Sequence, residues 1–221
     1  MKPLLKDYIT PESRILMIGC GNACLSEDLY DDGFPYVHNI DISTVVIDQM
    51  KKRSENRPNM IWEVMDCCQM DLDSNSFDIA IDKSTIDALL CGDNAYINVA
   101  KMMNEIIRVL KPNGLYMCIT YGTPDNRDEH FERAHLSWKM RQFVLYPASC
   151  ETEEQKKEKS HYVYLCNKNE DADTVSKKNY VDVLVSITKK IEFENYEQLR
   201  EDQALKQKIQ EKRKHYRSLS S

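Results

Sequence analysis

Two glycines and a later aspartate have the types and spacing needed to hold a nucleoside. Gly19 and Gly21 follow the apolar run Ile15–Ile18, and Asp41 comes at the end of the next apolar stretch. A glycine pair lets the main chain approach a ligand closely, and an acid at the tip of the next strand can accept both hydroxyl hydrogen bonds of a ribose. This order predicts a strand, a tight loop, a helix and a second strand around a nucleotide or nucleoside pocket.

The third glycine of the dinucleotide-binding fingerprint is missing, because Cys24 and Leu25 occupy its neighbourhood. Its absence argues against a pyrophosphate at the helix start and for a smaller ligand without phosphates, such as S-adenosylmethionine. The glycine pair alone would also fit an ordinary turn. The prediction therefore depends on the segments that follow.

Two further strands are predicted to end in charged residues. Asp66 and Cys67 follow the apolar-rich segment 60–64, and Asp82 and Lys83 follow the segment 77–81. Charged residues at successive strand ends line the crevice where open α/β sheets bind ligands. An alternative role for Asp41 and Asp66, as caps of the following helices, remains open.

Four segments together resemble the class I S-adenosylmethionine-dependent methyltransferases, and among them the branch that modifies lysines of translation elongation factor 1-alpha. The resemblance covers roughly residues 4–168, and its most selective motif is Asp82–Leu90, in which Ser84 stands in place of a glycine. It implies a doubly wound, mostly parallel seven-stranded α/β sheet with an antiparallel last strand. The segments that carry it are 16–22, 41–43, 65–66 and 82–90.

The resemblance also implies a role for each residue of the pocket. Ile42 would lie against the adenine, Asp66 would accept a hydrogen bond from its amino group, and the N–H of Cys67 would face a ring nitrogen. Asp82 and Lys83 would meet the amino-acid end of the cofactor. The predicted cofactor-binding residues are Gly19, Gly21, Asn22, Asp41, Ile42, Asp66, Cys67, Asp82 and Lys83.

The acceptor side of the reaction is less well defined by the sequence. A lysine nucleophile must lose its proton, and desolvation between aromatic walls lowers the pKa of an amine. Candidate walls lie in segments 121–124 and 135–138, where Trp138 also fits ordinary core packing. Asp87 fits a catalytic and an architectural role equally well, and no general base is assigned.

Related enzymes carry, before the first strand, an aromatic segment of the Tyr-Trp-x-x-Arg-Tyr kind followed by a Trp-Phe pair, which closes over the methionine end of the cofactor. Residues 1–14 lack this segment. We therefore expect either a longer form of the protein that carries it or another element that closes the site.

Composition favours a soluble, cytoplasmic enzyme without a membrane partner. The chain has 221 residues and a net charge of -6, and no apolar stretch approaches the roughly 20 residues of a membrane helix. The cysteines are scattered apart from Cys67 and Cys68, and the histidines form no pair at helical spacing, which predicts reduced thiols and no metal site.

The remaining segments complete the predicted sheet and add a C-terminal extension. Helices are expected at 44–54 and 95–110, and strands at 115–120, 142–146 and 161–166. Composition changes at 169–173, so the predicted domains are 1–168, which binds the cofactor, and 169–221, a charged extension. The extension is expected to contain a strand at 180–187 and a charged helix at 195–217, whose basic end at 205–217 fits either an acidic partner, RNA or plain solvation.

These features together predict a protein-lysine N-methyltransferase that uses S-adenosylmethionine and acts on a translation elongation factor. One alternative is a small-molecule or nucleic-acid methyltransferase. Nucleic acid is disfavoured because Asp82–Thr85 stands where amide-nitrogen and adenine methyltransferases place an Asn-Pro-Pro-aromatic signature. The other alternative is a cofactor-binding scaffold that lacks the N-terminal lid and is inactive.

Overall fold

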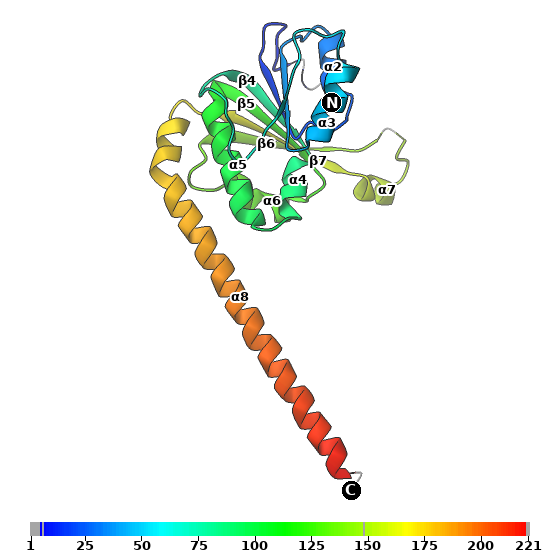
Figure 1. Ribbon diagram of the computed structural model, residues 1–221, viewed down its shortest axis with the longest axis vertical. Coiled ribbons are helices and arrows are strands. Elements are labelled where there is room, and N and C mark those ends of the chain that lie inside the picture. The colour runs from blue at the N-terminus through cyan, green and yellow to red at the C-terminus, as the bar shows by residue number, and fades with distance from the viewer. Residues whose placement is uncertain (1–4, 6, 148, 220–221) are drawn as a thin grey trace. The chain divides into compact units, whose positions relative to one another are not determined.

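The computed structural model describes residues 5, 7–147 and 149–219, and its centre is a single 7-stranded sheet (Figure 1). The strand order is β3-β2-β1-β4-β5-β7-β6. Neighbouring strands from β3 to β5 are parallel, whereas β7 is antiparallel to both β5 and β6. The predicted fold class is confirmed. The strands are β1 (Ile15–Ile18), β2 (Val37–Asp41), β3 (Ile61–Val64), β4 (Phe77–Lys83), β5 (Leu110–Thr120), β6 (Trp138–Leu145) and β7 (His161–Lys168).

Helices cover both faces of this sheet. Side chains alternate between the two faces of a strand, so Met17 of β1 packs in one core cluster with helices α2 and α3, and Leu16 packs in the other with α4, α5 and α6. The short helix α7 precedes β7. The bounds are α2 (Leu25–Asp31), α3 (Thr44–Arg53), α4 (Thr85–Leu90), α5 (Ala95–Val109), α6 (Pro124–Phe131) and α7 (Glu153–Glu158).

The central strands contain continuous apolar runs, which favour burial in the middle of the sheet. Every residue of β1 is buried, as expected for a parallel strand covered on both faces. Ile18 of β1 lies opposite Asp82 of β4 in the register. The loops that follow these two strands therefore emerge side by side, at the point where the strand order reverses and where open α/β sheets bind ligands.

The long C-terminal helix α8 (Ala172–Leu219) replaces the predicted mixture of strand and helix. The predicted strand at 180–187 is wrong, and the helix expected at 195–217 is present. Leu184, Ile187 and Ile191 are spaced for one side of a helix, and no glycine or proline interrupts the segment. Most side chains of the basic run 205–217 lie outside the described residues. No helix in the described part of the chain is long and apolar enough to cross a membrane.

The chain divides into two compact units, Met1–Val181 and Asp182–Ser221. The first turns of α8 belong to the first unit, since Ser176 Oγ donates a hydrogen bond to Asn104 Oδ1 of α5 at 2.6 Å. The buried ammonium of Lys168 lies 2.8 Å from Asp173 Oδ1 and 2.7 Å from the carbonyl oxygen of Leu110. Ser176 and Asp173, which make two of these contacts, lie beyond the predicted domain boundary at residue 168.

Shortening the chain tests this boundary. Ending after Lys168 removes Asp173 and leaves a buried ammonium without its carboxylate, so we expect the free energy of unfolding to fall by roughly 2–4 kcal/mol. A chain ending after Val181 keeps the ion pair and should unfold like the full chain. Urea unfolding of all three chains is the measurement. Equal stability of the two shortened chains would show that the start of α8 adds nothing to the first unit.

Candidate functional site

A cavity of about 300 Å³ opens at the carboxyl edge of the sheet, beside the reversal in strand order. The ends of β1, β2, β3 and β4 and the first turn of α4 form its walls. Six of the nine residues predicted from the sequence line it. They are Gly19, Asp41, Ile42, Asp66, Cys67 and Lys83, joined by Met65, Ser84, Thr85, Ala88 and Leu89.

The glycine loop after β1 has a backbone that favours glycine. Gly19 and Gly21 have φ values of +58° and +55°, in the left-handed region. A Cβ on Gly19 would lie 2.3 Å from Thr85 Oγ1, whereas a Cβ on Gly21 would meet nothing within 4 Å. Thr85 Oγ1 also donates a hydrogen bond to the carbonyl oxygen of Ile18 at 2.8 Å. Because Gly19 has no side chain, α4 can approach the loop closely. The space beside Gly21 is open.

Asp41 fastens this loop to the end of β2. Its Oδ2 accepts a hydrogen bond from the N–H of Gly21 at 2.9 Å, and its Oδ1 accepts one from the N–H of Ser43 at 2.9 Å. The cap of α3 is Ser43, whose side chain accepts from the N–H of Val46. The half-buried Asp41 carboxylate therefore orders the loop and lines the cavity, and it is not the helix cap that the sequence left as an alternative.

The loop after β3 brings one carboxylate and two thiols together at the same cavity. The N–H of Cys68 donates to Asp66 Oδ1 at 2.8 Å, and the Cys68 thiol donates to the carbonyl oxygen of Asn98 at 3.4 Å. A hydrogen bond with Cys68, together with burial, raises the pKa of the Cys67 thiol, so Cys67 presents a neutral side chain to the cavity.

The Asp66 carboxylate and the two thiols lie within 4.8 Å of one another, the one such group of possible metal ligands in the described part of the chain. The sequence had excluded the adjacent cysteines as a comfortable metal site without considering Asp66. All eight cysteines are free thiols. The expected lack of a bound metal stays a prediction.

Two predicted residues point elsewhere. Asn22 is exposed and does not line the cavity, and its carbonyl oxygen accepts a hydrogen bond from Arg53 at 3.0 Å. The carboxylate of Asp82 is fully buried beneath α4, where it accepts hydrogen bonds from the N–H groups of Thr85 at 2.7 Å and Ile86 at 3.1 Å and from the Tyr116 hydroxyl at 3.1 Å. Burial raises the pKa of Asp82 to about 6. Asp82 therefore holds the start of α4 in place and does not reach the cavity with its side chain.

Ser84 also takes a left-handed backbone, with φ at 67°. A glycine adopts this conformation without steric cost. The geometry explains why the resembling motif has a glycine where this chain has a serine.

A smaller apolar groove of about 190 Å³ adjoins the cavity, and Lys83 lines both. The groove is formed by the ends of β5 and β6 and the start of β7. Tyr121 stands at its rim and packs against His161, with 4.3 Å between the ring centroids and 46° between the ring planes. The sequence predicted Tyr121 as a wall but gave no signal for His161 or Tyr146. The other lining residues are Ile119, Leu145, Tyr146, Pro147 and His161.

Asp87 positions the start of the loop that carries Tyr121. Its Oδ1 accepts hydrogen bonds from Arg127 at 2.7 Å and from the Thr120 hydroxyl, and its Oδ2 accepts from the N–H of Tyr121 at 3.3 Å. Of the two roles left open by the sequence, the geometry supports the architectural one.

The second predicted wall, Trp138, belongs to the core. Trp138 begins β6 and pairs with Lys168 at the end of β7, so it lies at the opposite edge of the sheet from the cavity. Its indole N–H donates to the carbonyl oxygen of Phe131 at 3.0 Å, and its ring lies 5.9 Å from that of Tyr116. Its assignment as a wall of the site is wrong, and ordinary packing is the correct reading.

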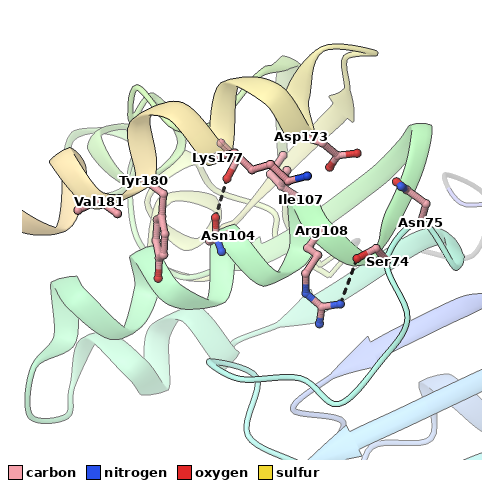
Figure 2. Close-up of a pocket in the computed structure, with 10 residues that line it drawn as sticks. Ser74, Asn75, Asn104, Ile107, Arg108, Asp173, Lys177, Tyr180 and Val181 are labelled. Carbon is pink, nitrogen blue, oxygen red and sulfur yellow. Dashed lines mark hydrogen bonds between the residues drawn. The ribbon is translucent and has the colours of Figure 1, made fainter.

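Figure 2 shows another cavity, of about 280 Å³, between α5 and the first turns of α8. Its largest cation, Arg108, pairs with Glu105 at 2.7 Å and donates to the carbonyl oxygens of Met70 and Leu72. This guanidinium is therefore occupied within the protein. The cavity also adjoins the start of β5. Ligands of open α/β sheets bind beyond the carboxyl ends of the strands, so this cavity lies at the opposite edge from the expected ligand site.

Substituting the two loop glycines separates backbone strain from steric conflict. Gly19→Ala and Gly21→Ala both place a side chain on a left-handed backbone, at a cost of about 1–2 kcal/mol. Only at Gly19 does the new Cβ meet Thr85, and overpacking typically adds about 1–3 kcal/mol. We expect Gly19→Ala to be the less stable variant in urea unfolding, and Gly19→Ala combined with Thr85→Ala to recover part of the difference. Equal destabilisation would mean that the loop shifts away from Thr85 freely.

Replacing Asp41 tests the pocket itself. Asp41→Ala should weaken S-adenosylmethionine binding by about 2–4 kcal/mol, because charge-assisted hydrogen bonds contribute roughly 1.5–3 kcal/mol each and do not add fully. The affinity of Asp41→Asn for S-adenosylmethionine should lie between those of the wild type and Asp41→Ala. Its amide keeps one oxygen acceptor but sets an NH2 group against a backbone N–H. Calorimetric titration measures both, with exposed Asp48→Ala on α3 as the control. Unchanged affinity in folded Asp41→Ala would remove Asp41 from the site.

Comparison with known proteins agrees with this geometry. The family model described as a methyltransferase domain matches residues 16–118. The chain is 36% identical over 148 residues to EEF1A lysine methyltransferase 4 of Bos taurus, which covers 63% of this chain and 58% of that protein. It is 44% identical over 120 residues to the eEF1A lysine and N-terminal methyltransferase of Xenopus laevis, which covers 53% of this chain and 17% of that protein.

A solved structure shares the fold. An S-adenosylmethionine-dependent methyltransferase from Methanosarcina mazei superposes with a TM-score of 0.58 at 17% identity, over 76% of this chain and 98% of that one. Residues 16–118 therefore match a methyltransferase domain, and the chain has the fold of the class I S-adenosylmethionine-dependent methyltransferases.

Proposed function

We propose that this protein is a protein-lysine N-methyltransferase that acts on translation elongation factor 1-alpha in the cytoplasm. The observation that carries the proposal is the pair of adjoining depressions, one suited to the cofactor and one lined by aliphatic and aromatic side chains. The names of the relatives support the substrate, although the chain spans only 58% and 17% of their lengths.

The residues of the larger cavity fit S-adenosylmethionine. The Asp41 oxygens each retain a lone pair for the ribose hydroxyls, because each accepts one backbone hydrogen bond. The exposed side chain of Ile42 offers an apolar surface for the adenine, and Asp66 and the neutral Cys67 lie at the same end. When bound, this cofactor supplies an activated methyl group, so the protein's task is to hold and align the two reactants.

The groove fits the side chain of a lysine. Its apolar lining suits the methylene chain, and the exposed Tyr121 ring and the half-buried His161 ring can face an amine. In water roughly one lysine amine in a few thousand is neutral at pH 7. Removal of water between these rings lowers the pKa of the amine and so increases the neutral, nucleophilic fraction.

The loop that follows β5 places Tyr121 at the rim of this groove. The ion pair of Asp87 with Arg127 and the hydrogen bond from the N–H of Tyr121 fix the loop that leaves β5. A Cβ on Gly122 would lie 2.2 Å from the Arg127 guanidinium carbon, so the loop passes tightly beneath that side chain. Asp87 is thus a positioning residue for Tyr121.

Methyl transfer from tritiated S-adenosylmethionine tests the function. We expect label on a lysine of purified elongation factor 1-alpha, located by mapping of the labelled peptide. Label that survives protease digestion of a cell extract would instead indicate a nucleic-acid or small-molecule substrate. Cofactor binding without transfer to any component would indicate the scaffold alternative.

A pair of tyrosine variants tests the groove. Tyr121 is 61% exposed at its rim, and Tyr36, before β2 at the other edge of the sheet, is 49% exposed. Tyr121→Ala should lower kcat/KM for the protein substrate by about 3- to 30-fold, the value of a cation–π or aromatic contact, with cofactor affinity unchanged. Tyr36→Ala should change neither. Equal rates for the two variants would place the acceptor outside this groove.

A further inference from the structure

Lys83 stands between the two depressions of the site. It is the last residue of β4, it is exposed, and it lines both the cofactor cavity and the apolar groove. The described residues make no hydrogen bond or ion pair with its ammonium group. A cation without a partner at the junction of two reactant sites calls for a functional explanation.

The acids nearest to Lys83 along the chain and across the sheet are engaged elsewhere. Asp82 accepts four hydrogen bonds beneath α4, and Asp87 is paired with Arg127. On the cavity side, Asp41 accepts two backbone N–H bonds and Asp66 accepts one, and the Cys67 thiol is neutral. Both acids on that wall line the cofactor cavity, and neither lines the groove.

None of the described residues that line the groove is an acid. His161 Nδ1 lies 3.3 Å from the carbonyl oxygen of Lys159, and the Tyr146 ring has the ammonium of Lys156 at 5.2 Å from its centroid. Glu153 accepts a hydrogen bond from that ammonium at 2.6 Å, and the phenol of Tyr121 lies at the rim beside His161. An amine that enters the groove would therefore meet Lys83 as the one cation among the described lining residues, whereas the nearby Lys156 is paired with Glu153 at 2.6 Å.

We propose that Lys83 lowers the pKa of the lysine amine that enters the groove and so increases the fraction of neutral nucleophile. Like charges at close range disfavour the protonated form, and the ammonium of the substrate gives up its proton to water on binding. Two like charges a few ångström beyond direct contact in a partly solvated site repel by about 1 kcal/mol, which corresponds to about half to one pH unit. This inference rests on the proposed lysine methyltransferase function.

The competing role for Lys83 is an ion pair with the carboxylate of the cofactor. The two roles differ in what a neutral substitution changes. Loss of an ion pair weakens cofactor binding at every pH. Loss of a like charge next to the acceptor leaves cofactor binding intact and changes the protons released when the acceptor binds.

The experiment measures that proton release. Elongation factor 1-alpha is titrated into the protein saturated with S-adenosylhomocysteine, by calorimetry in two buffers of different ionisation enthalpy at about pH 9, close to the pKa of a lysine. Wild type and Lys83→Arg should release protons on binding, and Lys83→Met should release clearly fewer. Exposed Lys52→Met on α3 is the charge-matched control and should behave as wild type.

Turnover supplies a second readout. The pH profile of kcat reports the bound amine, and for Lys83→Met it should move upward by about half to one pH unit. Unchanged proton release and profile, or a pH-independent loss of S-adenosylhomocysteine affinity, would overturn the inference while leaving the methyltransferase function standing. If the wild-type protein transfers no methyl group, the proposed methyltransferase function is wrong, and this inference, which rests on it, is wrong as well.

Discussion

The contact between Thr85 and Gly19 is the constraint on which the site depends. It joins the start of α4 to the loop after β1, where the strand order reverses, and the Thr85 hydroxyl completes it by donating to the carbonyl oxygen of Ile18. Because α4 approaches so closely, residue 19 can carry no side chain and Ser84 must turn through a left-handed conformation. The cavity is the space left beside this junction, and Asp41 and Asp66 border it from the neighbouring strands.

Charge at this edge of the sheet is divided between fixed and free groups. The Asp82 carboxylate is kept from water and stabilised by four donors, and burial still raises its pKa to about 6. Asp87 and Arg127 neutralise each other where β5 ends. These groups hold backbone segments in place. Lys83 differs from them, because its ammonium adjoins both the cavity and the groove.

Local sequence signals were sufficient for the first four strands and much of the cavity. The buried run of β1, the glycine loop and the acids after β2 and β3 are all close in sequence to the elements that place them. The role of Asp82 was not predictable, since its burial depends on Tyr116 from a distant strand. Trp138 and His161 depend on the antiparallel register of β6 and β7, which the order of residues does not reveal. The segment 180–187 was misread because its branched apolar residues satisfy the spacing of a strand and of a helix.

The reversed direction of β7 separates the chain into two functional parts. All residues that line the cofactor cavity come from the segment 19–89, whereas the groove takes most of its lining from the segment 119–161. Because β7 runs opposite to β5, the connection between β6 and β7, which includes α7, begins and ends at the edge where the acceptor would enter. That connection can change in length and sequence without altering the strands or the nucleoside pocket. A change in this one hairpin would therefore reshape the groove while leaving the cavity lined by residues 19–89 intact.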